Sequence, residues 1–218
     1  MDTWKLNVVE NIVTGQLEQK ESFGGQEKMK VKHEQVYLGD TISDDGKHFK
    51  NVEARRNKSL GIITQIMDIL KSVFFGKYYF EVALVLRSSL LLSSLLPNSE
   101  AWVNLTAKDI RSLEQTEEIL LSKILDCEAN TSNVFNYLEL GIYPVKFEIM
   151  KRKILFLHYL LNQEKSSMIF KVLQATRDNP VKNDFVKTCE DYLSALKINL
   201  SFEQLGDFSN WSVEKLVK

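Results

Sequence analysis

The sequence is poor in the two residues that most often interrupt regular structure. It contains 9 glycines and 3 prolines among 218 residues, roughly half of their average usage. So few of them over this length predict long uninterrupted elements, which are usually helices. All-β sandwiches and barrels need many turns, so the composition argues against them, and it also argues against collagenous and low-complexity chains.

The sequence also has few cysteines, almost no net charge and no long apolar run. Cys127 and Cys189 are too few for a disulfide framework and predict reduced thiols of an intracellular protein, nuclear or cytoplasmic. The formal charge of −1 is unusual for a free-standing nucleic-acid-binding protein. The most apolar stretch, 82–96, contains Arg87 and four serines, and it is shorter than the ~20 residues of a membrane span. We expect a buried helix there and no contact with a membrane.

The motifs that mark common enzyme sites are missing too. The sequence has no glycine-rich phosphate loop, no HExxH, no GxSxG and no CxxC, and its three histidines lack metal-ligand spacing. Asp44–Asp45 stands in Ser-Asp-Asp-Gly, which is typical of a turn. The acidic pairs Glu117–Glu118 and Glu190–Asp191 are interpreted as solvent-exposed helix faces. We therefore expect no catalytic residue, no metal site and no cofactor in this chain.

The residues that are present predict a division of the chain. Five of the nine glycines lie within the first 46 residues, among β-formers and turn signals. We expect 1–46 to be β-rich and to contain a hairpin, 47–127 to be a first helical region, and 128–218 to be a helical extension. The expected fold class is mainly α, a helical bundle preceded by a small β-hairpin segment.

Helical periodicity then runs to the end of the chain. Thr106 and Asp109 predict a capping box at the start of the third helix. The expected helices are 49–72, 77–96, 106–125, 131–138, 144–162, 165–177 and 181–196, followed by short helices that begin at Ser201 and Ser209.

The first of these helices combines an apolar stripe with a basic segment. Its apolar stripe consists of Val52, Ile63, Ile66, Met67 and Leu70. Lys47, Asn51, Arg55 and Lys58 fall on the opposite side, and in the second half Ile62 and Ile69 occupy that side, which predicts deep burial there. Between residues 47 and 60 there are five basic residues and one acidic residue, a local charge of +4. Such a face can follow a phosphate backbone; the alternative is a solvated surface without a ligand.

Short motifs follow one another in a fixed order along nearly the whole chain. They are YLGD (37–40), ISDDG (42–46), Asn51 with Arg55, FEVA (80–83), LRSSLL (86–91), NSEAW (98–102) with LT (105–106), YLELG (137–141) with Pro144, and Arg152 with LHY (157–159). This order resembles the C-terminal part of the endonuclease–reverse transcriptase polyproteins of non-LTR (LINE-like) retrotransposons. These are RNA-directed DNA polymerases.

The resemblance implies a nucleic-acid-binding role without chemistry. The family's catalytic aspartates lie in a Y/F-x-D-D motif upstream of Tyr-Leu-Gly, and Asp44–Asp45 matches the family's turn instead. The Mg²⁺ ions of the intact enzyme need those palm aspartates, so we expect this chain to be an inactive fragment by itself. Tyr37, Leu38, Gly39 and Asp40 match the primer-grip hairpin.

The first thumb helix of the family is matched by Asn51, Arg55, Arg56 and Lys58, and Lys47 joins them as an expected nucleic-acid-binding residue. The expected partner of this helix, in the full-length context, is an RNA–DNA or RNA template–primer duplex. The alternatives are a free-standing helical protein-interaction module and a non-functional retroelement remnant.

Overall fold

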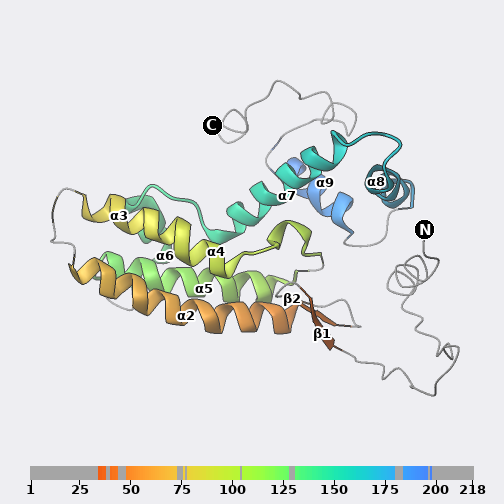
Figure 1. The fold of residues 1–218 in the computed structure, drawn as a ribbon. Coiled ribbons are helices and arrows are strands. Elements are labelled where there is room, and N and C mark those ends of the chain that lie inside the picture. Colours follow the sequence, from red (N-terminus) through yellow and green to blue (C-terminus); the bar gives the residue numbers. More distant parts are fainter. Residues whose placement is uncertain are drawn as a thin grey trace, which may run out of the picture. The chain divides into compact units, whose positions relative to one another are not determined.

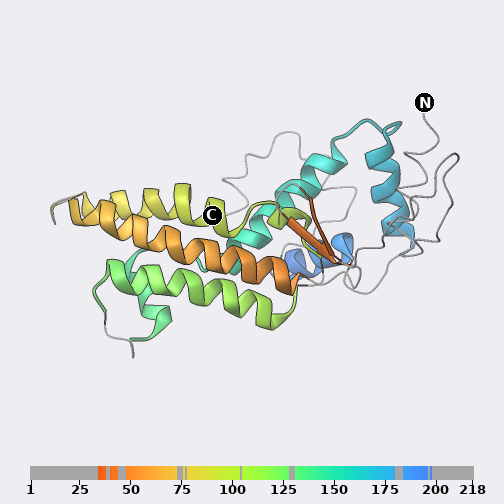
Figure 2. The same ribbon diagram turned by 60° about the horizontal axis from the view of Figure 1, so that its bottom comes forward.

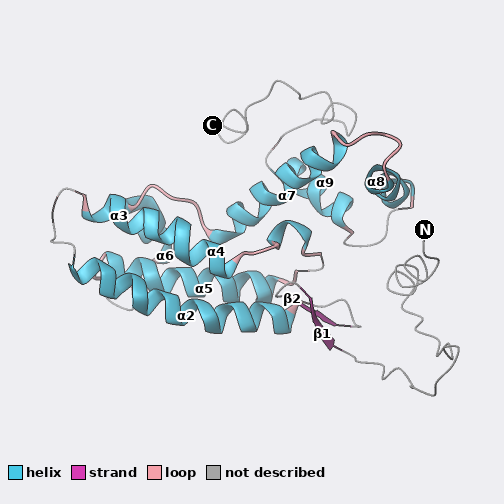
Figure 3. Cartoon of the chain, in the orientation of Figure 1, coloured by secondary structure: helices cyan, strands magenta, loops and turns pink. Residues whose placement is uncertain are grey.

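The structure is a computed structural model. It describes residues 34–37, 40–43, 48–72, 76, 78–103, 105–127, 131–179, 184–195 and 197. Within these residues the chain is mainly helical (Figure 3), as its low glycine and proline content predicts. It divides into two compact units, 1–47 and 48–218, and each is considered by itself.

In the first unit, two short strands form an antiparallel pair. Strand β1 (Glu34–Tyr37) pairs with β2 (Asp40–Ser43), and Tyr37 stands opposite Asp40. The other strands expected before residue 34, together with Leu38, Gly39, Asp44, Asp45 and Lys47, lie outside the described residues.

The second unit contains the helices. They are α2 (Phe49–Ser72), α3 (Tyr79–Leu86), the π-helical turn η1 (Arg87–Leu91), α4 (Leu92–Leu95), the 3₁₀ turn η2 (Ser99–Ala101), α5 (Ala107–Ile124), α6 (Asn133–Glu139), α7 (Val145–Leu161), α8 (Met168–Asp178) and α9 (Phe185–Ala195). The short helices expected after Ser201 and Ser209 lie outside the described residues.

Helix α2 packs along α5 on one side and along the α3–η1–α4 segment on another, as Figures 1 and 2 both show. Its predicted apolar stripe is confirmed: Val52, Ile63, Ile66 and Leu70 are buried and Met67 is half-buried. The deep burial expected in its second half is wrong, because Ile69 is 42% exposed. The neighbouring helices leave an outer side of α2 uncovered along its whole length.

The segment expected as one central helix over 77–96 is helical from Tyr79 to Leu95 but contains the π-helical turn η1. It is not central, because the side chains of Phe80 and Val85 are exposed. Ser88, Ser89 and Ser93 donate their hydroxyl protons to carbonyls four residues earlier, at 2.9, 2.8 and 2.6 Å. Such bonds satisfy serine hydroxyls inside an apolar helix.

Local signals correctly place the start of α5, the end of the α6 region and the start of α7. The capping box is confirmed: Thr106 Oγ1 accepts from the Asp109 amide at 3.2 Å, and Asp109 Oδ2 accepts from the Thr106 amide at 2.9 Å. Gly141 ends the α6 region at a φ of 63°, a left-handed conformation that glycine adopts without strain. Helix α7 starts directly after Pro144, a residue that suits a helix start.

Three buried clusters form the core. The first joins α2, α3, η1, α5 and α6, the second joins α2, α4, Trp102, α5 and the start of α7, and the third joins α7, α8 and α9. The first cluster contains Leu120 and Ile124 before residue 127 and Tyr137 and Leu140 after it. The boundary expected at residue 127 therefore does not coincide with a gap in the core, and the three-part division stays a prediction.

Two glycines allow a matched test of this backbone. An added Cβ meets no atom within 4 Å at Gly61 or at Gly141, but only Gly141 has a positive φ. Gly61→Ala, at an exposed position inside α2, should raise the free energy of unfolding by about 1 kcal/mol. Gly141→Ala should lower it by about 1 kcal/mol through strain. Urea denaturation checks both values, and shifts of the same sign would contradict the geometry.

Candidate nucleic-acid interface

The basic residues of α2 are distributed around the first half of the helix. Lys50 and Lys58 are exposed on its outer side, whereas Arg55 and Arg56 are half-buried. Successive helical residues are 100° apart, so the two arginines point to different flanks. The four basic side chains, which we call the basic collar, therefore point in directions spread around the helix, and they do not form one flat face.

Asn51 does not belong to the exposed surface where the helical wheel placed it. It is only 2% exposed, and Ser59, eight residues further along the same helix, is fully buried. Because α2 packs against both α5 and the α3–α4 segment, its buried arc is wider than the apolar stripe and includes these polar residues. The expectation of an exposed Asn51 is therefore wrong.

The basic collar borders a pocket of about 480 Å³ between α2 and α5. One wall comes from α2, in the positions i, i+3, i+4 and i+7 that share a helix face. The other comes from the first three turns of α5. The residues of the two walls are Phe49, Val52, Glu53 and Arg56 from α2, and Lys108, Asp109, Arg111, Ser112 and Gln115 from α5.

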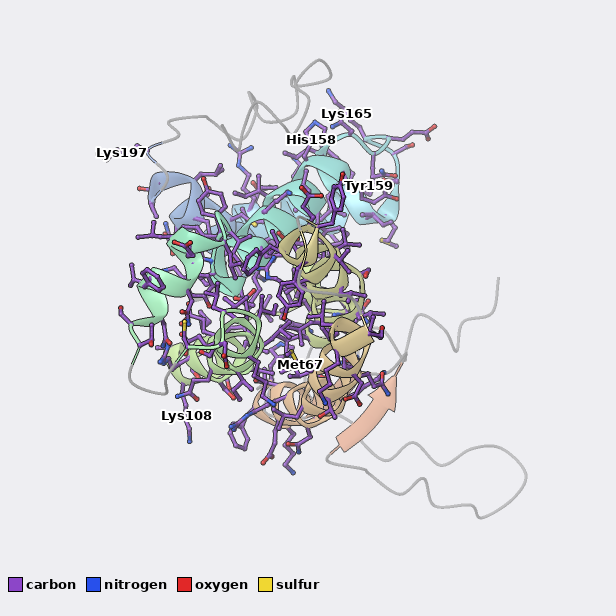
Figure 4. All side chains as sticks on the ribbon, turned by 90° about the vertical axis from the view of Figure 1, so that its left-hand side faces the viewer. Met67, Lys108, His158, Tyr159, Lys165 and Lys197 are labelled. Carbon is purple, nitrogen blue, oxygen red and sulfur yellow. The ribbon has the colours of Figure 1, made fainter. Side chains whose placement is uncertain are left out.

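The charged groups of this pocket differ in how they are neutralised. Arg111 Nη1 donates to Glu118 at 2.7 Å and lies 3.7 Å from Glu114. The carboxylate of Asp109 is engaged by the capping box. Arg56 Nε is buried without a hydrogen-bond partner, and Lys108 Nζ lies 5.3 Å from the centroid of the Phe49 ring. Figure 4 shows Lys108 pointing away from the helices into solvent.

The hairpin residues of the predicted site belong to the other compact unit. Tyr37 lies in β1, and Asp40 lies in β2 and is half-buried. Leu38, Gly39 and Lys47 lie outside the described residues, so their assignment to the site stays a prediction.

The described residues contain neither a metal-binding cluster nor a membrane-spanning helix. There, no three histidine, cysteine or acidic side chains are grouped so that they could hold a metal ion. Both cysteines are free, Cys189 being buried and Cys127 half-buried. In the same part of the chain, no helix combines the length and the apolar character that crossing a membrane requires.

Comparison of the chain with protein-family models, with curated proteins and with solved structures finds no match.

Helix α5 also carries a buried ion pair that the sequence did not predict. Glu117 was expected on a solvent-exposed face, but it is fully buried and Glu118 is only 8% exposed. Glu117 Oε1 accepts from Arg87 Nε at 2.7 Å and from Arg87 Nη2. Oε2 accepts from the Tyr137 hydroxyl at 2.9 Å and from the Val145 amide at 3.0 Å. The only sequence signal was Arg87, a charge inside an apolar stretch.

Burial and hydrogen bonding act on these groups in opposite directions. Burial raises the pKa of Glu117. The positive charge of Arg87 and the hydrogen bonds donated by Arg87, Tyr137 and the Val145 amide act to lower it. Burial and the negative charge of Glu117 raise the pKa of Tyr137. The set joins η1, α5, α6 and the first residue of α7, and so it holds α5 in the position that shapes the pocket.

Breaking this ion pair should be costly. Glu117→Gln leaves the Arg87 guanidinium buried without a counter-charge and should lower the free energy of unfolding by about 3 to 5 kcal/mol. Glu114→Gln, which removes a partner of the half-exposed Arg111, is the control and should cost less than about 1 kcal/mol. Equal losses in urea denaturation would show that Glu117 is not a structural anchor.

A second buried charge lies on α7. Lys153 is fully buried, its Nζ donates to the carbonyl oxygen of Trp102, and it lies 5.6 Å from the centroid of the Phe185 ring. No carboxylate in the described part of the chain forms an ion pair with it. Burial lowers the pKa of Lys153 to about 8, and burial raises the pKa of the neighbouring Cys189 thiol to about 12.

These two shifts predict an unusual pH dependence. Just above pH 8 the folded chain has released the Lys153 proton and the unfolded chain still holds it. Lys153 alone would therefore make the free energy of unfolding rise with pH by at most about 1.4 kcal/mol per pH unit, and the opposing Cys189 thiol leaves a net rise of roughly a few tenths of a kcal/mol. Cys189 opposes the rise at higher pH. The unfolded thiol ionises near its ordinary pKa of about 8.5 while the folded thiol stays protonated, which lowers the free energy of unfolding. The rise is therefore expected over roughly pH 7.5 to 8.5.

Urea denaturation across that pH range tests the assignment to Lys153. Lys153→Met should remove the rise, since methionine fills a similar volume without a charge. Lys151→Met, at an exposed position of the same helix, should retain it. Identical pH profiles for the two variants would show that another group is responsible.

Proposed function

We propose that this chain binds the phosphate backbone of a template–primer duplex, RNA–DNA or RNA, in the manner of the thumb region of a non-LTR retrotransposon reverse transcriptase. In this proposal the chain is a C-terminal fragment of such an RNA-directed DNA polymerase, acting in the nucleus or the cytoplasm. It positions the duplex, and no chemical step is assigned to it. The hairpin residues Tyr37 to Asp40 would contact the primer end in the full-length protein.

The observation that carries the proposal is the basic collar of α2. Lys50 and Lys58 are exposed, two further arginines stand between them, and Glu53 is the one acidic residue of the segment. A helix rises 1.5 Å per residue, so Lys50 and Lys58 are about 12 Å apart along its axis. One strand of a duplex carries three to four phosphates over about that length. The spacing thus supports contact with several phosphates of one strand.

A specific observation also favours the alternative of a protein-interaction module. Several large apolar side chains on α6 and the start of α7 are exposed, among them Leu138 at 76%. They are Val134, Phe135, Leu138, Tyr143 and Phe147. Exposed apolar surface of this kind is typical of protein contacts. A stoichiometric protein partner for a folded chain without nucleic-acid affinity would favour this alternative, and the absence of both ligands would favour a non-functional remnant.

A salt-titrated binding assay tests the proposal. The full chain should bind a labelled RNA–DNA hybrid at ~50 mM salt, and log affinity should fall linearly with log salt concentration. Lys50→Glu combined with Lys58→Glu should abolish most of that affinity, because both charges lie on the outer side of α2. The matched control is Lys151→Glu with Lys171→Glu, two exposed lysines of α7 and α8.

Two outcomes would contradict the proposal. One is a wild-type chain that is folded by circular dichroism and binds no hybrid at this salt concentration. The other is an equal loss of affinity in both double variants, which would show that binding depends on total charge and not on α2.

A further inference from the structure

The pocket between α2 and α5 is a partly enclosed site, whereas Lys50 and Lys58 are exposed on the surface of α2. Its walls are two parallel rows of side chains on packed helices, and Val52, at 2% exposure, closes its inner end. Its volume of about 480 Å³ lies within the range of small-molecule sites. A group bound there would be partly removed from water, unlike a group that touches only Lys50 or Lys58.

We propose that this pocket holds one backbone phosphate of the bound nucleic acid, with Arg56 and Lys108 as its cationic partners and Phe49 beside the adjoining sugar. The inference rests on the proposed function and adds a defined contact on α5, a helix to which the sequence resemblance assigns no nucleic-acid contact.

Arg56 has an unfilled hydrogen-bonding requirement. It lines the pocket, and its Nε is buried without a partner in the described part of the chain. An unmade bond of a buried donor is unfavourable. A guanidinium group bonds well to phosphate oxygens, which accept several of its N–H groups at once. The unpaired Nε of Arg56 is therefore suited to an oxyanion that enters from the pocket.

Lys108 supplies the second cation from the opposite wall. Its side chain lines the pocket and its ammonium lies 5.3 Å from the Phe49 ring centroid, and no described acidic side chain pairs with it. The other cation of this wall, Arg111, is already engaged by Glu118 and Glu114. Among the cations of the pocket, Arg56 and Lys108 are thus the two without an acidic partner in the described part of the chain.

The acidic side chains of the pocket define which anion fits. The Asp109 carboxylate is held at the start of α5 by the capping box, where the helix dipole stabilises negative charge. Glu53 is exposed at the rim and repels an incoming anion. A phosphodiester carries a single negative charge and suffers less from Glu53 than a doubly charged terminal phosphate does. This favours a backbone phosphate over a free mononucleotide.

Three variants of the full chain test the inference in the hybrid-binding assay. Arg56→Gln with Lys108→Gln should weaken binding about tenfold at ~50 mM salt and reduce the slope of log affinity against log salt by about 1. Glu53→Gln should strengthen binding, because it removes the repelling charge. Lys151→Gln with Lys171→Gln, neutral substitutions at exposed positions elsewhere, is the control and should leave the slope unchanged. Circular dichroism and urea denaturation verify that each variant is folded.

The result separates this inference from the proposed function. Wild-type binding that is steeply salt-dependent, with Arg56→Gln and Lys108→Gln behaving as the control does, would overturn the pocket assignment and leave the α2 surface as the binding site. A folded wild-type chain without hybrid affinity would overturn both. Displacement of the hybrid by millimolar adenosine monophosphate, lost in the same variant, would reassign the pocket to a free phosphate ligand.

Discussion

The buried ion pair between Arg87 and Glu117 is the constraint on which the helical unit depends. Two charges inside a protein are tolerated only when their bonding is complete, and here both carboxylate oxygens accept hydrogen bonds from Arg87, Tyr137 and Val145. These partners come from three parts of the chain, η1, α6 and the start of α7, while Glu117 itself lies on α5. The pair therefore determines how η1, α6 and α7 meet α5, and through α5 it determines the wall that faces α2.

The packing of α5 against α2 decides which basic side chains of α2 are exposed and which line the pocket. A nearly neutral chain carries +4 over a short segment, and packing divides that charge into two kinds. Lys50 and Lys58 remain in solvent, where each charge interacts weakly and salt screens it. Arg56 lies on the side of α2 that faces α5, and it lines the same pocket as Lys108. In the proposed function, the same segment would attract an anionic polymer over a long range and would hold one of its phosphates at a defined position.

Local signals predicted the elements well because their causes are local. The Thr106–Asp109 capping box, the left-handed Gly141 and the start of α7 after Pro144 depend only on neighbouring residues. The apolar stripe of α2 was predicted for a similar reason, since periodicity alone identifies the side of a helix that avoids water. The burial of Asn51 was not predicted, because it depends on how many neighbours a helix has.

The sequence by itself determined the helical class, most helix ends, the inward side of α2 and the concentration of basic residues at its start. Only the tertiary structure decided that Glu117 is buried opposite Arg87, 30 positions away, and that Arg56 and Lys108 share a pocket. Both facts join residues from separate helices, and helix periodicity contains no information about which helix a given face will meet. Glu117 stands among polar residues in the sequence, so the sequence predicts that it is exposed. Its burial becomes evident only when Arg87 is found beside it. Contacts of this kind arise from packing, whose energy depends on the whole set of helices.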